Sequence, residues 1–365
     1  MPRSTQPPIR GKTAQIRSLL ESRIRFGEYQ LRSLPSERKL ASELGVSRMT
    51  ARKAIQQLLD SDLLNRLPNG EIIENRSARP TLRIAALVPT LASRDLEVWR
   101  HAIQRVAERH RASVRTVLYI HWDDLAIEDA LRSFDGVFIS PSCEPIPDRL
   151  ISRLRSAACP VVVLGRDLSS EGLPSIDLFP AVLTQRLLDH LAGLGHRAVD
   201  CFNVQTIDPV IQQRIAQWNV WRSAHGFAGR LLGEPVRAYD EPIVQAYSEV
   251  RRLLELNAFQ HSAVFCTTVP AALGLMRGLR EHGIGVGTDC SVCVMNDEGL
   301  APFITPTITS IPMPDPMPFL APCLDWFQRR RDTSGHDNRW FGPLLLQPTD
   351  VPIFAGESTG PANNR

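Results

Sequence analysis

Leu34–Gly70, LPSERKLASELGVSRMTARKAIQQLLDSDLLNRLPNG, is the stretch that decides the fold of the N-terminal part of the chain. Ser36 stands before an apolar-periodic run, as a helix N-cap does. Gly45 is able to end that helix in a left-handed conformation, and Ser47 caps a second helix two residues later. Two short helices separated by a tight glycine-containing turn are typical of a helix-turn-helix, and we expect a hairpin with Asn69-Gly70 at its tip to follow them.

The second helix has two different faces. At 100° per residue, its apolar residues fall in one arc and are expected to face the core: Ala51, Ala54, Ile55 and Leu58. Arg48 and Arg52 lie one turn apart on the remaining arc, near the helix start, which is the end that enters a major groove in such motifs. An arginine there can bind a guanine edge with two hydrogen bonds or pair with phosphates. The alternative is a solvated basic face, but the capped turn and the hairpin favour DNA binding.

Residues 10–74 resemble the winged-helix domain of the GntR family of bacterial transcription regulators, through LPSERKLASELGVSRMTARKAIQQL and LLNRLPNGEIIE. The resemblance implies direct DNA contacts from three arginines, backbone or base-edge contacts from two hydroxyl residues, and a wing tip that reaches toward the minor groove. These residues are Arg38, Arg48 and Arg52, then Ser47 and Thr50, then Asn69 and Gly70. The family's wing strand usually reads Gly-Thr-Phe/Tyr-Val, whereas this chain places the acidic Glu71 after Gly70.

Charge is distributed unevenly along the 365 residues, which are enough for two or three domains. The net charge is only +3, yet residues 1–80 hold 15 Lys and Arg against 8 Asp and Glu, and the remainder has a net charge of −4. Apolar residues at 43% and charged residues at 22% are ordinary for a globular protein. Positive charge is therefore concentrated on the segment with the helix-turn-helix, as a phosphate-binding module requires.

The seven cysteines have no disulfide-framework spacing. No secretory segment follows Met1, and no apolar run reaches the roughly 18 residues of a membrane span, so we expect a cytoplasmic protein without membrane contact. Cys290 and Cys293 form a CxxC pattern, but the sequence around them reads as a strand, where positions i and i+3 point to opposite faces. We therefore expect neither a metal site nor any other cofactor.

From Thr81 onward, continuous apolar runs alternate with amphipathic stretches, which indicates parallel sheets covered on both faces. The predicted order is LRIAALV, helix 96–109, VRTVLYI, helix 127–134, GVFIS, helix 149–157 and PVVVLG. It continues after Asp177 with a helix to Leu194, AVDCF, a helix around Trp218, PVRAY, helix 244–256, AVFCT, helix 271–282 and CSVCVM. The predicted fold class is α/β, with a winged helix at 10–75 that includes a first helix at 13–26, a linker at 76–81, and a two-lobed domain at 82–359.

This second region resembles the effector domain of the lactose/galactose repressor family, which is similar to periplasmic sugar-binding proteins. The matching pieces are LRIAALVPTL, FDGVFISPS, CPVVVLGRD, LAGLGHRAV, SAVFCTTVPAALGLMRGLREHGIGV, TDCSVCVMNDE and TPTITSI. The resemblance implies three crossings between the lobes, near Asp177, near 296–310 and near Arg331. It also implies an effector site that includes Arg214, Asn296, Asp177 and Trp99. The family's usual Asn-Asp after one strand is Thr267-Thr268 here, and its usual aspartate is Asn296, which suggests a changed or smaller ligand, or a weaker site.

Enzyme motifs are out of context. Gly356–Gly360 fits G-x-S-x-G, but no helix follows it as a nucleophile elbow requires, so we expect no catalytic residues. The sequence predicts a transcription regulator that senses a small molecule, most simply a sugar, and binds a palindromic DNA operator as a homodimer. Effector binding would shift the population of lobe closures and so alter the DNA-binding arms. Two alternatives remain: a sugar-processing enzyme with a DNA-binding arm, and a regulator whose second domain only dimerises.

Overall fold

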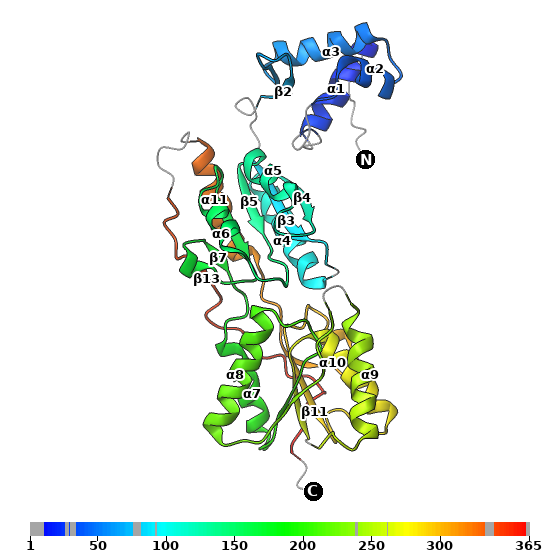
Figure 1. Cartoon of the computed structure of the whole chain (residues 1–365), viewed down its shortest axis with the longest axis vertical. Coiled ribbons are helices and arrows are strands. Elements are labelled where there is room, and N and C mark those ends of the chain that lie inside the picture. The colour runs from blue at the N-terminus through cyan, green and yellow to red at the C-terminus, as the bar shows by residue number, and fades with distance from the viewer. Residues whose placement is uncertain are drawn as a thin grey trace, which may run out of the picture.

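The computed structural model describes residues 11–25, 29, 34–75, 82–91, 93–237, 240–260, 262–332 and 339–362. Figure 1 shows a small N-terminal body of helices and a hairpin, followed by two larger bodies that each combine a sheet with helices. The predicted linker at 76–81 lies outside the described residues, as does most of the segment before the first helix. We call the two larger bodies lobe 1, built around the first large sheet, and lobe 2, built around the second.

The N-terminal body is a winged helix-turn-helix. It consists of α1 (Lys12–Arg25), α2 (Glu37–Glu43), α3 (Arg48–Asp60), β1 (Leu64–Arg66) and β2 (Ile72–Glu74), with the two strands antiparallel. The four residues predicted for the inner face of α3 are all at most 1% exposed, which confirms that prediction. On α1, Ile16, Leu20 and Ile24 are buried at a spacing of four residues. The apolar Leu19 lies outside that stripe and is 40% exposed.

Lobe 1 is a six-stranded parallel sheet with helices on both faces. Its strand order is β13 (Leu345–Leu346), β7 (Ser175–Ile176), β6 (Val161–Leu164), β5 (Gly136–Ile139), β3 (Arg83–Pro89) and β4 (Ser113–Tyr119). Ile84 and Ala86 pack toward α4 (Arg94–Arg109) and α11 (Met317–Asp332), whereas Ala85 and Leu87 pack toward α5 (Leu125–Ser133) and α6 (Asp148–Arg155). Burial on both faces explains why β3 is apolar without alternation.

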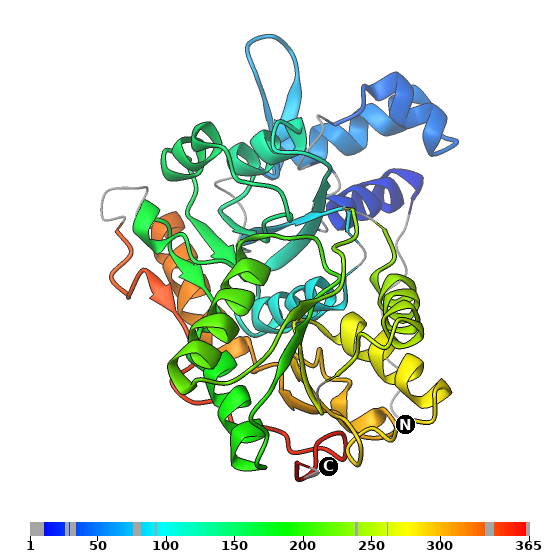
Figure 2. The same ribbon diagram turned by 60° about the horizontal axis from the view of Figure 1, so that its bottom comes forward.

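Lobe 2 repeats this plan of a parallel sheet between helices (Figure 2), and its sheet has five strands among the described residues. The strand order is β12 (Thr309–Ile311), β11 (Ser291–Met295), β10 (Ala263–Cys266), β8 (Asp200–Phe202) and β9 (Leu231–Leu232). One face carries α7 (Val182–Gly193) and α8 (Pro209–His225), and the other carries α9 (Pro242–Glu255) and α10 (Val269–Glu281). Helices α9 and α10 touch closely at Gly274, where an added Cβ would lie 2.4 Å from the Cβ of Ala246.

Within the described residues the chain crosses between the lobes three times, and two of the predicted positions were wrong. The first crossing follows β7 at Asp177, as predicted. The second comes after β12, through Pro312–Pro316, because β12 pairs with β11 in lobe 2 rather than forming part of the crossing. The third comes after β13, which still pairs with β7, and not near Arg331, which lies inside α11. Edge strands of two or three residues are too short to carry a recognisable pattern.

The predicted strand PVRAY was also wrong. The strand in that region is β9 at Leu231–Leu232, and residues 235–237 are not in a strand, while 238–239 lie outside the described residues. Gly233 ends β9 with a φ of 91°, and an added Cβ would lie 2.4 Å from the carbonyl oxygen of Asn203. A side chain at position 233 would therefore clash with the backbone of Asn203. The strand lies before this glycine, whereas the prediction placed it after the glycine, at PVRAY.

The G-x-S-x-G stretch and the CxxC pattern both have structural roles. Ser358 in the G-x-S-x-G stretch is fully buried, accepts a hydrogen bond from the Thr309 N–H at 2.8 Å, and donates one to the Val292 carbonyl. It therefore joins the C-terminal segment to the lobe 2 sheet. Cys290 and Cys293 pack into clusters on opposite faces of that sheet, as their spacing predicted. Within the described ranges, no helix is both long and apolar enough to cross a membrane.

Candidate functional site

The recognition helix α3 presents arginines to solvent. The Ser47 hydroxyl accepts a hydrogen bond from the Thr50 N–H at 3.1 Å and lies 2.8 Å from the Thr50 hydroxyl, which fixes the helix start. The side chains of Arg48 and Arg52 are 73% and 67% exposed. The Glu37 carboxylate lies 3.6 Å and 3.9 Å from their Nε atoms, so both side chains extend over the same acidic residue. The basic face of α3 is therefore exposed to solvent, with Glu37 beside it.

The wing tip presents both a tight turn and a negative charge. Gly70 has a φ of 84°, and its N–H donates to the Leu67 carbonyl at 2.9 Å. The Asn69 side-chain oxygen accepts from the Glu71 N–H at 3.0 Å, which holds the exposed Glu71 beside the tip. Arg38 on α2 is likewise exposed. The structure thus places the predicted DNA-contacting residues at the surface of one body, and it places Glu71 with them.

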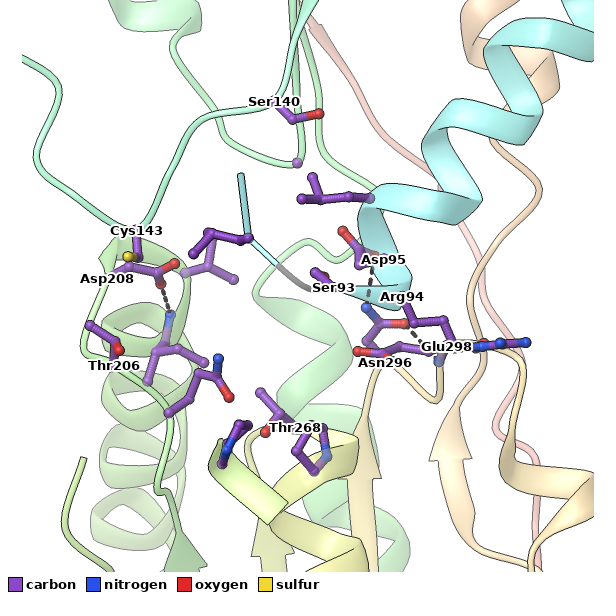
Figure 3. Close-up of a pocket in the computed structure, with 18 of the residues that line it drawn as sticks. Ser93, Arg94, Asp95, Ser140, Cys143, Thr206, Asp208, Thr268, Asn296 and Glu298 are labelled. Carbon is purple, nitrogen blue, oxygen red and sulfur yellow. Dashed lines mark hydrogen bonds between the residues drawn. The ribbon is translucent and has the colours of Figure 1, made fainter. Parts of the chain in front are cut away.

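A cavity of about 470 Å³ is lined by residues of both lobes. Its lining residues follow the carboxyl ends of parallel strands: Asp95 after β3, Ser140 after β5, Arg166 after β6, Asp177 after β7, Gln205 after β8, Thr268 after β10 and Asn296 after β11. Figure 3 shows polar side chains from these loops around the space. In open α/β sheets, ligands bind beyond this end of the strands. We call this cavity the cleft.

Arg214 is a buried cation in the cleft. It lies on α8, is 8% exposed, and donates from Nη1 to the Thr267 carbonyl at 2.6 Å. Burial lowers the pKa of Arg214, and the carboxylates of Asp208, Asp95, Asp177 and Glu298 act in the opposite direction. Its guanidinium carbon also lies 5.8 Å from the centre of the Phe179 ring. The acids therefore maintain a fixed positive group where a ligand would sit.

Among the described residues, two hydrogen bonds from side chains join the lobes across the cleft. Asn296 donates from Nδ2 to Asp95 Oδ1 at 3.1 Å, and Arg94 donates from Nε to the Glu298 carbonyl at 2.8 Å (Figure 3). Burial raises the pKa of Asp95, against the hydrogen bond from Asn296 and the charge of Arg214. Burial also raises the pKa of Glu298 to about 7, and the neighbouring Asp95 acts in the same direction. The cleft thus concentrates partly desolvated acids beside Arg214.

Three polar groups of the cleft have no hydrogen-bond partner within the described part of the chain. They are the Ser140 hydroxyl, the Gln205 side-chain carbonyl oxygen and the Thr268 hydroxyl. Leaving such a buried group unpaired costs roughly 1–3 kcal/mol, so a ligand that pairs with all three gains affinity. Sequence reasoning missed Ser140 and Gln205 and treated Thr268 only as a departure from the family. Each follows an apolar strand, which was the available signal.

The structure brings together the residues predicted for the effector site. Arg214, Asn296 and Asp177 all line the cleft, and burial raises the pKa of Asp177. Trp99 also lines the cleft, but it is 2% exposed and belongs to the core of lobe 1, so most of its ring packs inside the protein. Thr267, which stands at the family's usual asparagine, turns its hydroxyl to Asn203 Oδ1 at 2.6 Å and uses its carbonyl to hold Arg214.

Acidic side chains outnumber basic ones in the cleft. Among the described lining residues, four arginines face six acids: Arg94, Arg166, Arg214 and Arg237 against Asp95, Asp177, Asp208, Asp240, Glu241 and Glu298. An added anion would meet this field in a partly desolvated space, which is unfavourable. Hydroxyl groups, which both donate and accept hydrogen bonds, suit the carboxylates and the arginines equally. Among the described residues, no group of His, Cys, Asp and Glu is arranged to hold a metal ion.

Comparison with known proteins assigns both regions. Residues 12–72 match the family of bacterial regulatory proteins called gntR, and residues 188–316 match a periplasmic binding protein-like domain. The chain is 23% identical over 220 residues to the "Probable HTH-type transcriptional repressor ExuR" of Bacillus subtilis (strain 168), covering 58% of this chain and 61% of that protein. It is 24% identical over 209 residues to the "HTH-type transcriptional regulator AscG" of Escherichia coli (strain K12), covering 57% of each. The chain therefore spans less than two thirds of these relatives.

Solved structures confirm the fold of the two-lobed region. The lac repressor dimer bound to operator and the anti-inducer ONPF superposes with a TM-score of 0.60 at 21% identity, over 79% of this chain and 99% of that one. The regulator CCPA of Weissella paramesenteroides with bound glucose gives a TM-score of 0.62 at 16% identity, over 77% of this chain and 100% of that one. The chain thus carries a gntR-type helix-turn-helix domain followed by a periplasmic-binding-protein-like domain of the LacI-repressor fold.

Proposed function

We propose that the protein is a transcription regulator that binds DNA through its winged helix and responds to a small molecule in the cleft. The observation that carries this is the pairing of two sites on one chain. One is a capped recognition helix with exposed Arg48 and Arg52, and the other is a two-lobed cleft with a buried cation and unpaired polar groups. The regulators named ExuR and AscG, to which the chain is similar, support the same reading.

The proposed effector is a neutral sugar or a related polyol. Arg214 offers donors, Asn296 offers both a donor and an acceptor, and the unpaired oxygens of Ser140, Gln205 and Thr268 accept hydrogen bonds. A hydroxyl-rich ligand pairs with all of them, whereas the excess of carboxylates disfavours a sugar acid. A structural neighbour, CCPA, holds glucose in its structure, which agrees with this class.

The proposed assembly is a cytoplasmic homodimer on a palindromic operator. A single winged helix reads too few base pairs for genomic specificity, and two-fold symmetry doubles the site. A structural neighbour, the lac repressor, was solved as a dimer on its operator. Sedimentation of the full-length chain at micromolar concentration should give a dimer, and a monomer that still binds selected DNA tightly would contradict the palindromic site.

Titration calorimetry with a defined panel tests the effector assignment. The panel is D-glucose, D-galactose, D-xylose, L-arabinose, their alditols, and D-glucuronate and D-galacturonate. We expect at least one neutral member to bind and the two acids to bind more weakly. The DNA partner is obtained by selection from a random duplex library with the same protein. If no panel member binds while selected DNA does, the second domain serves dimerisation alone and the proposed sensing role is wrong.

Incubation of the protein with the same sugars distinguishes regulation from catalysis. A regulator returns each sugar unchanged, as measured by chromatography after a long incubation at high protein concentration. Stoichiometric binding with complete recovery of the sugar agrees with the proposal. Progressive conversion of a panel member would instead support the sugar-processing alternative and overturn the proposed role.

A further inference from the structure

Asp297 lies between two cleft residues in the sequence, and its side chain forms hydrogen bonds toward the second crossing between the lobes. Its neighbours Asn296 and Glu298 both make the contacts that cross to lobe 1. Asp297 is 2% exposed, and its carboxylate accepts three hydrogen bonds. Oδ1 accepts from the Gly299 N–H at 2.9 Å and the Met313 N–H at 3.1 Å, and Oδ2 accepts from the Ser310 hydroxyl at 3.2 Å. One side chain thus holds three separate points of the chain.

The three residues that bond to Asp297 belong to different parts of the structure. Gly299 closes the loop that carries the cleft residues, and Ser310 is in β12, an edge strand of lobe 2. Met313 lies in the second crossing, Pro312–Pro316, and its side chain packs against the core of lobe 1. A shift of the cleft loop therefore reaches the crossing directly, through two hydrogen bonds to the same carboxylate oxygen.

The cleft loop 296–299 has three residues in the left-handed backbone region, and two of them are not glycine. Asn296 and Glu298 have φ values of 59° and 51°, and Gly299 has a φ of 72°. Non-glycine residues in the left-handed region persist only where the surroundings hold them. Asn296 caps its own loop by accepting from the Glu298 N–H at 3.1 Å, but Asp297 supplies the contacts that connect this loop to β12 and to the crossing.

We propose that Asp297 is the positioning residue that ties the cleft loop 296–299 to the crossing between the lobes, so that the relative orientation of the lobes depends on its hydrogen bonds. Effector binding at Asn296 and Glu298 would then be transmitted to lobe 1 through Asp297. The transmission rests on the proposed function, whereas the positioning role is a property of the free protein and is tested without a ligand.

The test is the distance between spin labels on the two lobes of the full-length chain, measured by pulsed dipolar spectroscopy. Labels are attached at Arg155→Cys on α6 and Val220→Cys on α8, in a background where the half-buried Cys143 is replaced by serine. The remaining native cysteines are buried. Dilution with unlabelled protein removes distances between copies. The reference protein should show one narrow distance distribution.

Asp297→Ala should add a second, displaced distance population, because the loop and the crossing lose their shared acceptor. Asp297→Asn should restore most of the reference distribution, because the amide oxygen accepts both backbone N–H groups. Asp200→Ala is the matched control, since Asp200 is a fully buried acid of lobe 2 that accepts the Arg230 N–H at 2.7 Å away from the crossings. It should leave the distance distribution unchanged.

A reference-like distribution in Asp297→Ala would overturn the proposal, as would equal changes in Asp297→Ala and Asp200→Ala. If Asp297→Ala does not fold, Ser310→Ala replaces it, because this variant removes one hydrogen bond from the same carboxylate. It should broaden the distribution in the same direction, and an unchanged distribution would then contradict the proposal. Failure of every sugar to bind would refute the sensing role but leave this result intact.

Discussion

The recognition helix and the cleft both use arginine, but they hold it in opposite ways. Arg48 and Arg52 are 73% and 67% exposed, and their nearest described acid is the shared Glu37. Arg214 is 8% exposed, is held by a backbone carbonyl, and has its pKa lowered by burial. An exposed arginine exchanges water for phosphate at little cost, whereas a buried one is already desolvated and oriented. The first arrangement suits a charged polymer, and the second suits a small ligand of fixed shape.

The difference predicts that salt weakens DNA binding much more than sugar binding. Phosphate binding by exposed side chains releases counterions, so DNA affinity falls steeply as salt rises. Ligand binding in the cleft takes place among groups that are shielded from mobile ions, so sugar affinity changes little over the same range. Substitutions in either region should remove or exaggerate this contrast.

The largest expected effect is that of Arg214→Ala on sugar binding. Loss of a charge-assisted hydrogen bond costs about 1.5–3 kcal/mol, or roughly 10- to 150-fold in affinity. Calorimetry measures this with the neutral sugar that binds the wild-type protein. Arg222→Ala is the matched control, because Arg222 lies on the same helix, where it donates to Asn219. Equal sugar affinity in Arg214→Ala and wild type would show that the cleft is not the effector site.

Arg52→Ala tests the other half of the comparison. If Arg52 makes a bidentate contact to a base, its removal should cost about 1–3 kcal/mol of DNA affinity. Fluorescence anisotropy with the selected duplex, repeated at several salt concentrations, gives both the affinity and the salt slope. Arg100→Ala, at a side chain 39% exposed and paired with Glu97 on lobe 1, should leave both unchanged. Unaltered operator binding by Arg52→Ala would remove α3 from the interface.

The acids of the cleft predict a pH dependence. Burial raises the pKa of Glu298 from 4.5 to about 7, so the folded protein holds this proton where the unfolded chain has released it. Stability should therefore fall as the pH rises from about 4.5 to about 7, and above that range the loss caused by ionised Glu298 should stay constant. Glu298→Gln should flatten this part of the profile. Thermal melts of both proteins across the range measure the difference, and parallel profiles would contradict the assignment.

The smallest expected effect lies at the wing. Glu71 is exposed beside Asn69 and Gly70, where the resemblance places phosphates, so Glu71→Gln should strengthen DNA binding about twofold by removing a repulsion. The gain should shrink as salt rises. Asp62→Asn, at another exposed acid of the same body, is the control. A weaker complex with Glu71→Gln would mean that Glu71 itself contacts the DNA.

The winged helix and the cleft also differ in how much of each the sequence predicts. The inner face of α3 follows from helical periodicity alone, and its exposed arginines follow from what that face leaves outside. Arg214, Asn296 and Asp177 were placed through the resemblance, and the structure brings all three to one cavity. Ser140 and Gln205 were missed because their chemistry depends on an absent partner, which only the folded chain reveals. The sequence pattern therefore predicts which side chains of α3 are exposed, but it does not predict which buried polar groups lack a hydrogen-bond partner.

Two predicted positions of the lobe crossings were wrong for a related physical reason. β12 and β13 hold three and two residues, and their place in a sheet is set by neighbours far away in the sequence. No periodicity can develop over such lengths, so the strand was read as part of the connection. Gly233 had a similar effect, because its left-handed turn ends β9 before the apolar stretch that was taken for the strand.

The most direct test is titration of the protein–DNA complex with the panel sugar that binds the free protein. Saturating sugar should change the Kd for selected DNA, measured by anisotropy, by about 5- to 150-fold, the usual range for coupled sites. The same sugar should have no effect on the complex of Arg214→Ala. An unchanged Kd for DNA in wild type, at sugar concentrations where calorimetry shows the cleft to be full, would contradict the proposed coupling between the cleft and the winged helix.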